Sequence, residues 1–223
     1  MNMSSLSGAN LETDSPETTA GESHRRELEL LHKAQNGDRP AYGQLVLAYQ
    51  DRLFNAILRM VGDREEARDL TQEAFTRGLA KLDSFRSEAS PYTWLFRISL
   101  NLAISRLRKV QRKRVFSLSD PSAGGSGDDQ ASGLLDRLAS PAVPDPAQAA
   151  ENRERDEQVL AALGRLDAEY RAVLVMRDIE GFEYQEMAEV LGLPMGTLKS
   201  RLFRARLALR DELQEYLGGN GRR

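Results

Sequence analysis

The stretch GFEYQEMAEVLGLPMGTLKSRLFRARLALR, from Gly181 to Arg210, combines short amphipathic segments with a tight turn between them. Apolar residues at three- and four-residue spacing predict a first helix over 184–191. Gly192 follows where a helix end favours a positive φ, and Pro194 suits the start of a second helix. The stretch therefore predicts a helix-turn-helix.

The second helix of this pair carries charges of one sign. No acidic residue lies between Thr197 and Arg210, and the small residues Gly196 and Thr197 leave the helix start slim enough to approach a DNA groove. Hydroxyls near a helix start suit phosphate oxygens, and arginine suits the paired acceptors of guanine. A solvated arginine-rich face is the alternative. The residues predicted to contact DNA are Thr197, Lys199, Ser200, Arg201, Phe203 and Arg204.

The composition narrows the class of protein. The 223 residues include no cysteine and only His24 and His32 as imidazoles. This excludes disulfides and thiolate metal sites, and it argues against a histidine-based catalytic or zinc centre. The acidic residues are scattered as on helix surfaces, and no glycine-rich phosphate loop is present. We therefore expect no enzymatic activity, no cofactor and no bound metal.

Hydropathy bears on the location of the protein. No early cationic region precedes an apolar run, as a secretory signal requires. No window approaches the roughly 18 consecutive apolar residues of a membrane span. The sequence predicts a soluble, cytoplasmic protein without membrane insertion.

The net charge of −3 hides a separation of charge along the chain. From Arg97 to Arg114 there are seven cations and no anion, whereas 117–157 holds nine acids against three arginines. The field at a binding face depends on the charge within a Debye length of about 10 Å. The basic segment is therefore compatible with a nucleic-acid partner despite the overall balance.

Local signals place the helices that precede the acidic segment. Apolar residues recur at helical spacing over 42–61, Gly62 ends this helix, and Asp63 suits the N-cap of the next one. Ser90-Pro91 predicts the start of another helix, because the fixed φ and missing N–H of proline suit a first turn. No segment alternates as a strand would, so the sequence predicts an all-α fold.

Composition and periodicity divide the chain into two small helical domains joined by a flexible acidic linker. Proline, glycine and acidic residues replace the apolar periodicity in the linker, and small polar residues dominate the N-terminal tail. We expect a disordered tail over 1–24, a helical domain over 25–115, the linker over 116–149, a helix-turn-helix domain over 150–217 and a short tail over 218–223.

Three motifs together resemble the bacterial RNA polymerase sigma factors of the extracytoplasmic-function (ECF) group. GTLKSRLFRARLALR, over 196–210, is similar to the promoter-reading helix of that group. DLTQEAF, over 69–75, and YTWLFRI, over 92–98 and followed by Asn101, are similar to segments of its other domain. The resemblance covers nearly everything outside the tail and the linker, and three motifs in this order are more specific than any one of them.

The resemblance implies a polymerase contact on the segment 69–75, which is similar to the one that grips core RNA polymerase. Asp69 and Glu73 are one helical turn apart and would share an exposed face, whereas Leu70 and Phe75 would turn mostly toward the core. An ordinary solvated acidic face is the alternative. Contacts with core polymerase are thereby expected at Asp69, Leu70, Gln72, Glu73 and Phe75.

The segment 92–101 is similar to the one that contacts and melts the minus-ten promoter element. The loop 83–90 would catch a flipped base, and Trp94 either stacks near unpaired bases or packs in the core. The cations that follow would hold phosphates whatever the sequence. Minus-ten contacts are expected at Trp94, Phe96, Arg97, Asn101, Arg106 and Arg108.

The implied function is that of a sigma factor, which binds core RNA polymerase and directs promoter-specific initiation. The residues over 197–204 would read the minus-thirty-five element, and the other domain would read and help to melt the minus-ten element. Implied partners are core polymerase, double-stranded and melted promoter DNA, and an anti-sigma factor. The acidic linker either threads the polymerase cleft or serves only as a solubilising spacer. The alternative function is a helix-turn-helix regulator that is not a polymerase subunit.

Overall fold

The computed structural model describes residues 16–87, 89–118 and 146–219, and every regular element in these ranges is helical. This confirms the all-α prediction for the described part of the chain. The elements are α1 (Pro16–Gln35), α2 (Arg39–Val61), α3 (Arg64–Ala80), the 3-10 turn η1 (Leu82–Ser84), α4 (Pro91–Leu118), α5 (Pro146–Arg165), α6 (Ala168–Leu174), the π-helical turn η3 (Val175–Ile179), α7 (Tyr184–Leu191) and α8 (Met195–Gly219).

The helix boundaries of the first unit, α1–α4, follow from short-range chemistry. Asp38 caps α2 by accepting a hydrogen bond from the N–H of Ala41 at 3.1 Å. Gly62 ends α2 with a φ of 79°, in the left-handed region that glycine enters without cost. Asp63 then accepts from the N–H of Glu66 at 2.7 Å, and Ser90 accepts from the N–H of Thr93 at 3.0 Å. These contacts confirm the predicted boundaries at Gly62, Asp63 and Ser90-Pro91.

The core of the first unit lies where α2 is packed between its neighbours. Leu45, Leu53 and Ile57 of α2 are buried, and so are Leu95 and Ala103 of α4. Burying each large apolar side chain contributes about 1.5–3 kcal/mol. This core sets the orientation of α3 and α4, the helices on which the predicted polymerase and minus-ten contacts lie.

Gly78 is the point of closest approach between α3 and its neighbours. A Cβ atom there would lie 2.7 Å from Leu95 Cδ2 and 2.7 Å from the hydroxyl oxygen of Tyr42. Neither neighbour has room to move, because Leu95 is buried and the Tyr42 hydroxyl donates to the carbonyl of Phe75 at 2.6 Å. Burial also raises the pKa of Tyr42 to about 12.

We expect Gly78→Ala to lower the free energy of unfolding by about 1–3 kcal/mol, because the added methyl group overpacks the α3–α4 contact. The matched control is Gly43→Ala in α2, where an added Cβ meets nothing within 4 Å. Helix propensity predicts that this control stabilises the protein by up to about 1 kcal/mol. Urea denaturation followed by circular dichroism measures both, and equal midpoints for the two variants would contradict the packing described here.

The second unit, α5–α8, contains the predicted helix-turn-helix. Gly192 has a φ of 63° at the end of α7, and the N–H of Leu198 bonds to the carbonyl of Pro194 at the start of α8. Leu198 and Leu202 of α8 are buried. Met187 is also buried, but Ala188 and Leu191 are only half-buried, and Val190 takes the inward position beside Met187.

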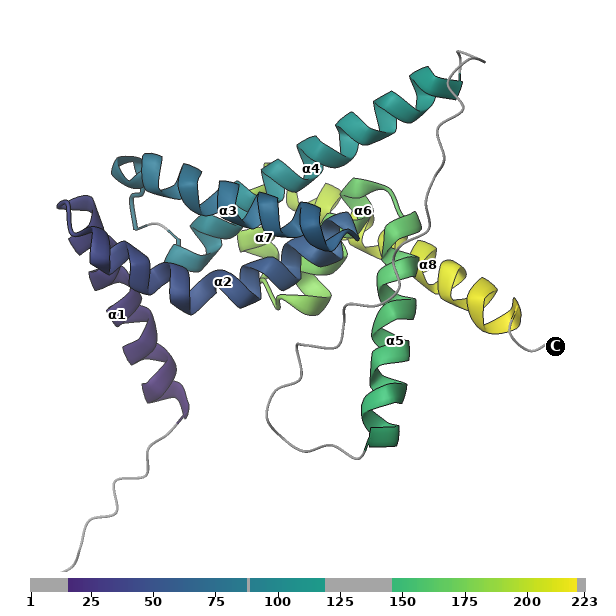
Figure 1. Ribbon diagram of the computed structural model, residues 1–223, viewed down its shortest axis with the longest axis horizontal. Coiled ribbons are helices and arrows are strands. Elements are labelled where there is room, and N and C mark those ends of the chain that lie inside the picture. The colour runs from purple at the N-terminus through teal and green to yellow at the C-terminus, as the bar shows by residue number, and fades with distance from the viewer. Residues whose placement is uncertain (1–15, 88, 119–145, 220–223) are drawn as a thin grey trace, which may run out of the picture.

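The two helical units that the sequence predicted are present, and they pack against each other, a contact that the sequence did not indicate. Helix α4 contacts α6, and α2 contacts α5, α6 and η3. Figure 1 shows the far ends of α4 and α8 extending beyond the packed body. The buried side chains of both units form one continuous cluster.

The segment boundaries differ from the predicted ones at several ends. Helix α1 begins at Pro16, so 16–24 is helical where a disordered tail was predicted. Proline suits the first helical turn, and packing of Leu31 and Leu28 nucleates a helix that extends toward the N-terminus. Helix α4 continues to Leu118 and α5 begins at Pro146, inside the predicted linker. Residues 1–15, 119–145 and 220–223 lie outside the described residues.

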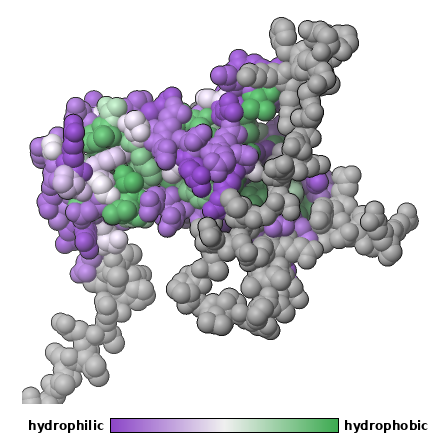
Figure 2. Space-filling model, viewed as in Figure 1, coloured by the Kyte–Doolittle hydropathy of each residue, from purple (hydrophilic) through white to green (hydrophobic). Residues whose placement is uncertain are grey.

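The surface is mostly polar. Figure 2 shows hydrophilic side chains over most of the visible face, with smaller hydrophobic areas among them. Within the described ranges, no helix is both long enough and apolar enough to cross a bilayer.

Candidate polymerase and nucleic-acid interface

Helix α3 presents the predicted polymerase-binding residues on two faces. Asp69, Gln72 and Glu73 are exposed, and Glu73 pairs with Arg77 at 2.5 Å. Leu70 and Phe75 are buried, at 7% and 8% exposure. The structure thus places three polar side chains where a partner can reach them, and it uses the two apolar ones to fix the helix on the core.

The predicted minus-ten residues of α4 differ in accessibility. Arg97 and Asn101 are exposed. Trp94 is half-buried and meets the ring of Phe85 edge-on, with the ring centroids 5.5 Å apart. Trp94 therefore packs partly in the core, and only its remaining surface is open to a nucleic acid.

Phe96 lies at the boundary between the two units and is 2% exposed. Its ring centroid is 4.8 Å from that of Phe182, in the loop between η3 and α7, and Tyr92 completes this aromatic group. Phe182 must move away before Phe96 can touch DNA. The second unit thus covers one of the residues expected to read the minus-ten element.

The predicted phosphate contacts Arg106 and Arg108 are already paired with carboxylates. Arg106 donates to Glu66, and this hydrogen bond raises the pKa of the Arg106 guanidinium. Arg108 pairs with Glu169 at 3.1 Å. Both arginines are exposed, so a phosphate group would compete with these carboxylates for the same donors.

Helix α8 leaves most of its predicted DNA-contact residues open. Thr197, Lys199, Ser200, Phe203 and Arg204 are exposed, and Phe203 retains 65% of its surface. The Ser200 hydroxyl donates to the carbonyl of Thr197 at 2.9 Å. An apolar ring this exposed lacks a packing role within the described residues and is available to a partner.

Arg201 is the predicted DNA-contact residue of α8 that is not fully exposed. Its guanidinium pairs with Glu169 at 2.9 Å, and its side chain is 23% exposed. Glu169 therefore holds one predicted DNA-contact arginine from each unit, Arg108 and Arg201. Sequence reasoning missed Glu169, because no local spacing signals a contact between α6 and the end of α4.

Glu180 provides another contact between the units that the sequence did not signal. Its carboxylate is 5% exposed and accepts from Arg52 Nε at 2.9 Å and from the Tyr92 hydroxyl at 2.7 Å. The Arg52 guanidinium lies 3.9 Å from the centroid of the Tyr92 ring. Burial and the neighbouring Glu180 carboxylate raise the pKa of Tyr92. The wider π-helical turn η3 ends directly before Glu180 and delivers it to this position.

Arg171 of α6 joins the units through backbone carbonyls. Its side chain is buried and donates to the carbonyl of Met60, in the last turn of α2, and to the carbonyls of Gly164 at 2.7 Å and Leu166 at 3.0 Å. Carbonyls near a helix C-terminus carry partial negative charge and favour a cation. Burial lowers the pKa of Arg171, although arginine stays protonated at any physiological pH.

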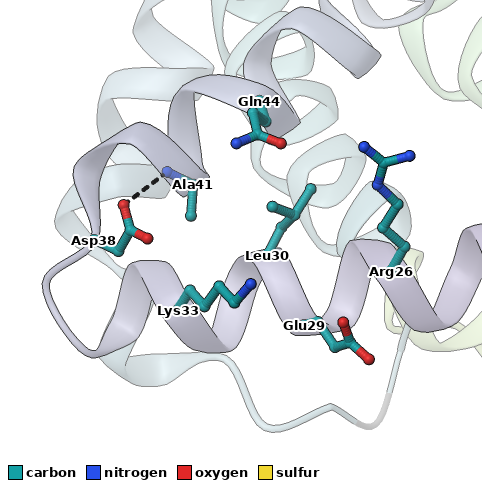
Figure 3. Close-up of a pocket in the computed structure, with 7 residues that line it drawn as sticks. All are labelled: Arg26, Glu29, Leu30, Lys33, Asp38, Ala41 and Gln44. Atoms are coloured by element: carbon teal, nitrogen blue, oxygen red, sulfur yellow. Dashed lines mark hydrogen bonds between the residues drawn. The ribbon is translucent and has the colours of Figure 1, made fainter.

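A hollow of about 480 Å³ lies between α1 and α2 and is drawn in Figure 3. Arg26 and Lys33 mix with Glu29 and Asp38 around it, so it has no single sign of charge to select an ion. The Asp38 carboxylate is also engaged in capping α2. No group of three or more metal-ligating side chains comes together in the described parts of the chain. We assign the hollow no functional role.

Comparison with known protein families identifies the family to which the chain belongs. A Sigma-70 region 2 family model matches residues 45–113, and a Sigma-70 region 4 family model matches residues 156–209. The chain belongs to the sigma-70 family. The first match contains the exposed acidic face of α3 and the minus-ten candidates of α4, and the second contains the helix-turn-helix.

Curated relatives narrow the class to the ECF group of sigma factors. The chain is 35% identical over 86% of its length to the RNA polymerase sigma-H factor of Pseudomonas aeruginosa, covering 96% of that protein. It is 33% identical over 83% of its length to the ECF RNA polymerase sigma factor SigW of Bacillus subtilis, covering 95% of it. It is 31% identical over 84% of its length to the ECF sigma-E factor of Escherichia coli K12, covering 94% of it. The family resemblance drawn from the three motifs is confirmed.

Solved structures of sigma factors share the fold. CnrH in complex with the cytosolic domain of CnrY aligns with a TM-score of 0.57 at 26% identity, over 85% of this chain and 98% of that one. RpoE of Bartonella quintana, in complex with the anti-sigma factor NepR, aligns with a TM-score of 0.55 at 26% identity, over 78% of this chain and 96% of that one.

Proposed function

We propose that the chain is a promoter-specificity subunit in which α3 binds core RNA polymerase, α4 reads and helps to melt the minus-ten element, and α8 reads the minus-thirty-five element. Membership of the ECF group supports this division. The observation that carries it is the helix-turn-helix: Leu198 and Leu202 anchor α8 in the core, while the residues from Thr197 to Arg204 that face outward remain open to DNA. The nucleotide-adding chemistry belongs to the polymerase.

The acidic face of α3 suits a basic surface on the polymerase. Asp69 and Glu73 are exposed one turn apart, and Gln72 lies between them along the chain. Such a face steers a partner of opposite charge and fixes the register of docking. Leu70 and Phe75 contribute by holding the helix in place.

Promoter binding requires the two units to separate. Phe96 is covered by Phe182, and the arginines Arg108 and Arg201 share Glu169 in the packed arrangement. On a promoter, both arginines exchange this carboxylate for phosphates or bases. Tethering the two units to one polymerase raises the effective concentration of each contact, so neither unit needs high affinity for DNA alone.

We also propose an anti-sigma partner for this chain. Two relatives of known structure were solved with such proteins: CnrH with the cytosolic domain of CnrY, and RpoE with the anti-sigma factor NepR. A partner of this kind would cover the faces assigned to polymerase and DNA. The proposed location is the cytoplasm, where these faces meet the polymerase.

Run-off transcription with core polymerase and promoter-selected genomic fragments tests the proposal. The expected result is initiation at defined sites only when the chain is present, with an upstream motif shared by the selected fragments. Pull-down of core polymerase separates this function from that of an independent regulator. A chain that binds operator DNA tightly as a free dimer and ignores polymerase would refute the sigma-factor function.

Replacement of Arg204 by alanine tests the role of α8. We expect it to weaken discrimination at one position of the minus-thirty-five element by about 1–3 kcal/mol, because a bidentate arginine contact with a base is lost. Competition binding with variant promoters and the assembled holoenzyme measures this change. Arg210→Ala is the control, since Arg210 lies further along α8 and pairs with Asp211. Loss of core-polymerase binding in Arg204→Ala would contradict the assignment of polymerase binding to α3 and of minus-thirty-five reading to α8.

A further inference from the structure

The last residue of α1 reaches the turn that joins α3 to α4. The Gln35 side-chain amide donates to the carbonyl of Leu82 at 2.8 Å and to the carbonyl of Phe85 at 3.2 Å. One helical turn earlier, His32 Nε2 lies 3.1 Å from the Ser87 hydroxyl oxygen. Helix α1 therefore holds this turn from outside the α3–α4 pair.

The backbone geometry of the turn between α3 and α4 depends on the contacts that Gln35 and His32 make with it. Leu82 and Phe85 are both 7% exposed, and the Gln35 amide satisfies two carbonyls that belong to them. The Leu82 carbonyl also accepts from the N–H of Phe85 at 3.1 Å, so Gln35 reinforces this turn and supplies a donor to the partly buried Phe85 carbonyl. Together these hydrogen bonds fix the backbone over 82–85. Ser87, next to His32, has a φ of 52°, in the left-handed region that side chains other than glycine enter only where the surroundings hold them.

The turn between α3 and α4 also sets the position of Trp94. The ring of Phe85 meets the Trp94 indole edge-on, with a centroid distance of 5.5 Å and an interplanar angle of 68°. Trp94 is half-buried, and Phe85 is the aromatic neighbour that limits how its ring can tilt. A shift of the Phe85 backbone would therefore change the surface that Trp94 presents to nucleic acid.

Gln35 lies outside the segment that the Sigma-70 region 2 family model matches. The matched Sigma-70 region 2 segment begins at residue 45, after the end of α1.

We propose that Gln35 is a positioning residue for minus-ten recognition, acting on Trp94 through the carbonyls of Leu82 and Phe85. This inference rests on the proposed function, because it requires α4 to read the minus-ten element. Gln35 itself touches no DNA. Its contribution is to hold the turn in one position, so that the accessible surface of Trp94 keeps one orientation.

The test compares full-length Gln35→Glu with the wild type. Glutamate has the same shape but only acceptors, so it loses both donors. Each protein is combined with core polymerase and a promoter library that is randomised across the minus-ten element and fixed elsewhere. We expect the ratio of transcription between the best and the other bases to fall about five-fold at one or more positions, in line with the loss of a pair of hydrogen bonds.

Three further variants separate positioning from folding. Gln35→Lys restores a donor of similar reach, so it is expected to regain most of the discrimination. Gln44→Ala changes an exposed glutamine on α2 and is expected to leave the ratios at the wild-type value. In a Trp94→Ala background, Gln35→Glu is expected to have no further effect on the ratios, because its action passes through the missing ring.

Several outcomes overturn the inference. A purely structural role would lower transcription from every library member by the same factor and leave the ratios unchanged. Equal ratios in the wild type and Gln35→Glu, with thermal unfolding midpoints recorded alongside, refute positioning. If the wild type itself shows no base preference or does not initiate with core polymerase, the proposed function fails, and this inference fails with it.

Discussion

The double substitution Asp69→Lys, Glu73→Lys is expected to lower the affinity for core RNA polymerase by at least about 100-fold, because each residue supplies a charged contact worth about 1.5–3 kcal/mol. Both carboxylates are exposed on α3, and their reversal turns an attractive face into a repulsive one. Fluorescence anisotropy with labelled protein and purified core polymerase measures the affinity. Run-off transcription should fall with it.

The control for this double substitution is Glu22→Lys, Glu29→Lys on α1, which changes the same charge on exposed side chains. The fold is expected to survive the change on α3, since the Glu73–Arg77 pair is exposed and such pairs contribute at most about 1 kcal/mol. Circular dichroism checks this. Normal polymerase binding by the double variant, or an equal loss in the control, would refute the assignment of α3.

Removing the Arg171 side chain is expected to cause the largest loss of stability. Arg171→Ala removes the donor from the carbonyls of Met60, Gly164 and Leu166 and leaves a cavity at the contact between α2 and α6. A carbonyl left without its donor costs about 1–3 kcal/mol and the cavity adds to this, so we expect a total loss of about 3–5 kcal/mol. Urea denaturation measures the free energy of unfolding directly.

Arg165→Ala provides the comparison, because Arg165 is exposed and pairs with Glu212 at 3.4 Å. We expect it to cost at most about 1 kcal/mol. Arg171→Lys keeps the charge but not the planar set of donors. We therefore expect its loss in free energy of unfolding to lie between those of the two alanine variants. An Arg171→Ala protein as stable as the wild type would show that these carbonyl contacts do not hold the units together.

Helix boundaries could be predicted from the sequence because their causes are local. Gly62 and Gly192 adopt positive φ, and Asp63 and Ser90 cap the helices that follow them. The apolar spacing of α7 and α8 likewise gave the helix-turn-helix. Each of these signals involves residues within about one turn of each other, so a single sequence contains all the information needed.

The packing of the two units could not be predicted in this way. Periodicity shows which face of a helix is apolar, but not which other face it meets. The contacts of Glu169, Arg171 and Glu180 with the first unit join residues 61, 111 and 128 positions apart. Charged residues at such separations look like ordinary surface residues until the fold brings their partners together.

Phe96 shows where a local signal was available but not used. Tyr92, Leu95 and Phe96 are spaced as a buried face of α4, and all three are buried. The resemblance of this segment to the minus-ten segment of sigma factors nevertheless placed Phe96 among the expected DNA contacts. In the structure its neighbour is Phe182, so any role in promoter binding depends on exposure of the α4 face that the second unit now covers.

The continuous hydrophobic cluster runs through α1–α4 and α5–α8, so each half buries apolar side chains against the other. We expect unfolding of one half to destabilise the other, because the apolar surface that they bury against each other would then be exposed to water. A destabilising substitution in one half is therefore expected to lower the melting temperature of the whole chain or to reduce the cooperativity of its unfolding. In the function proposed here, the halves that separate on a promoter are the same halves that stabilise each other in its absence.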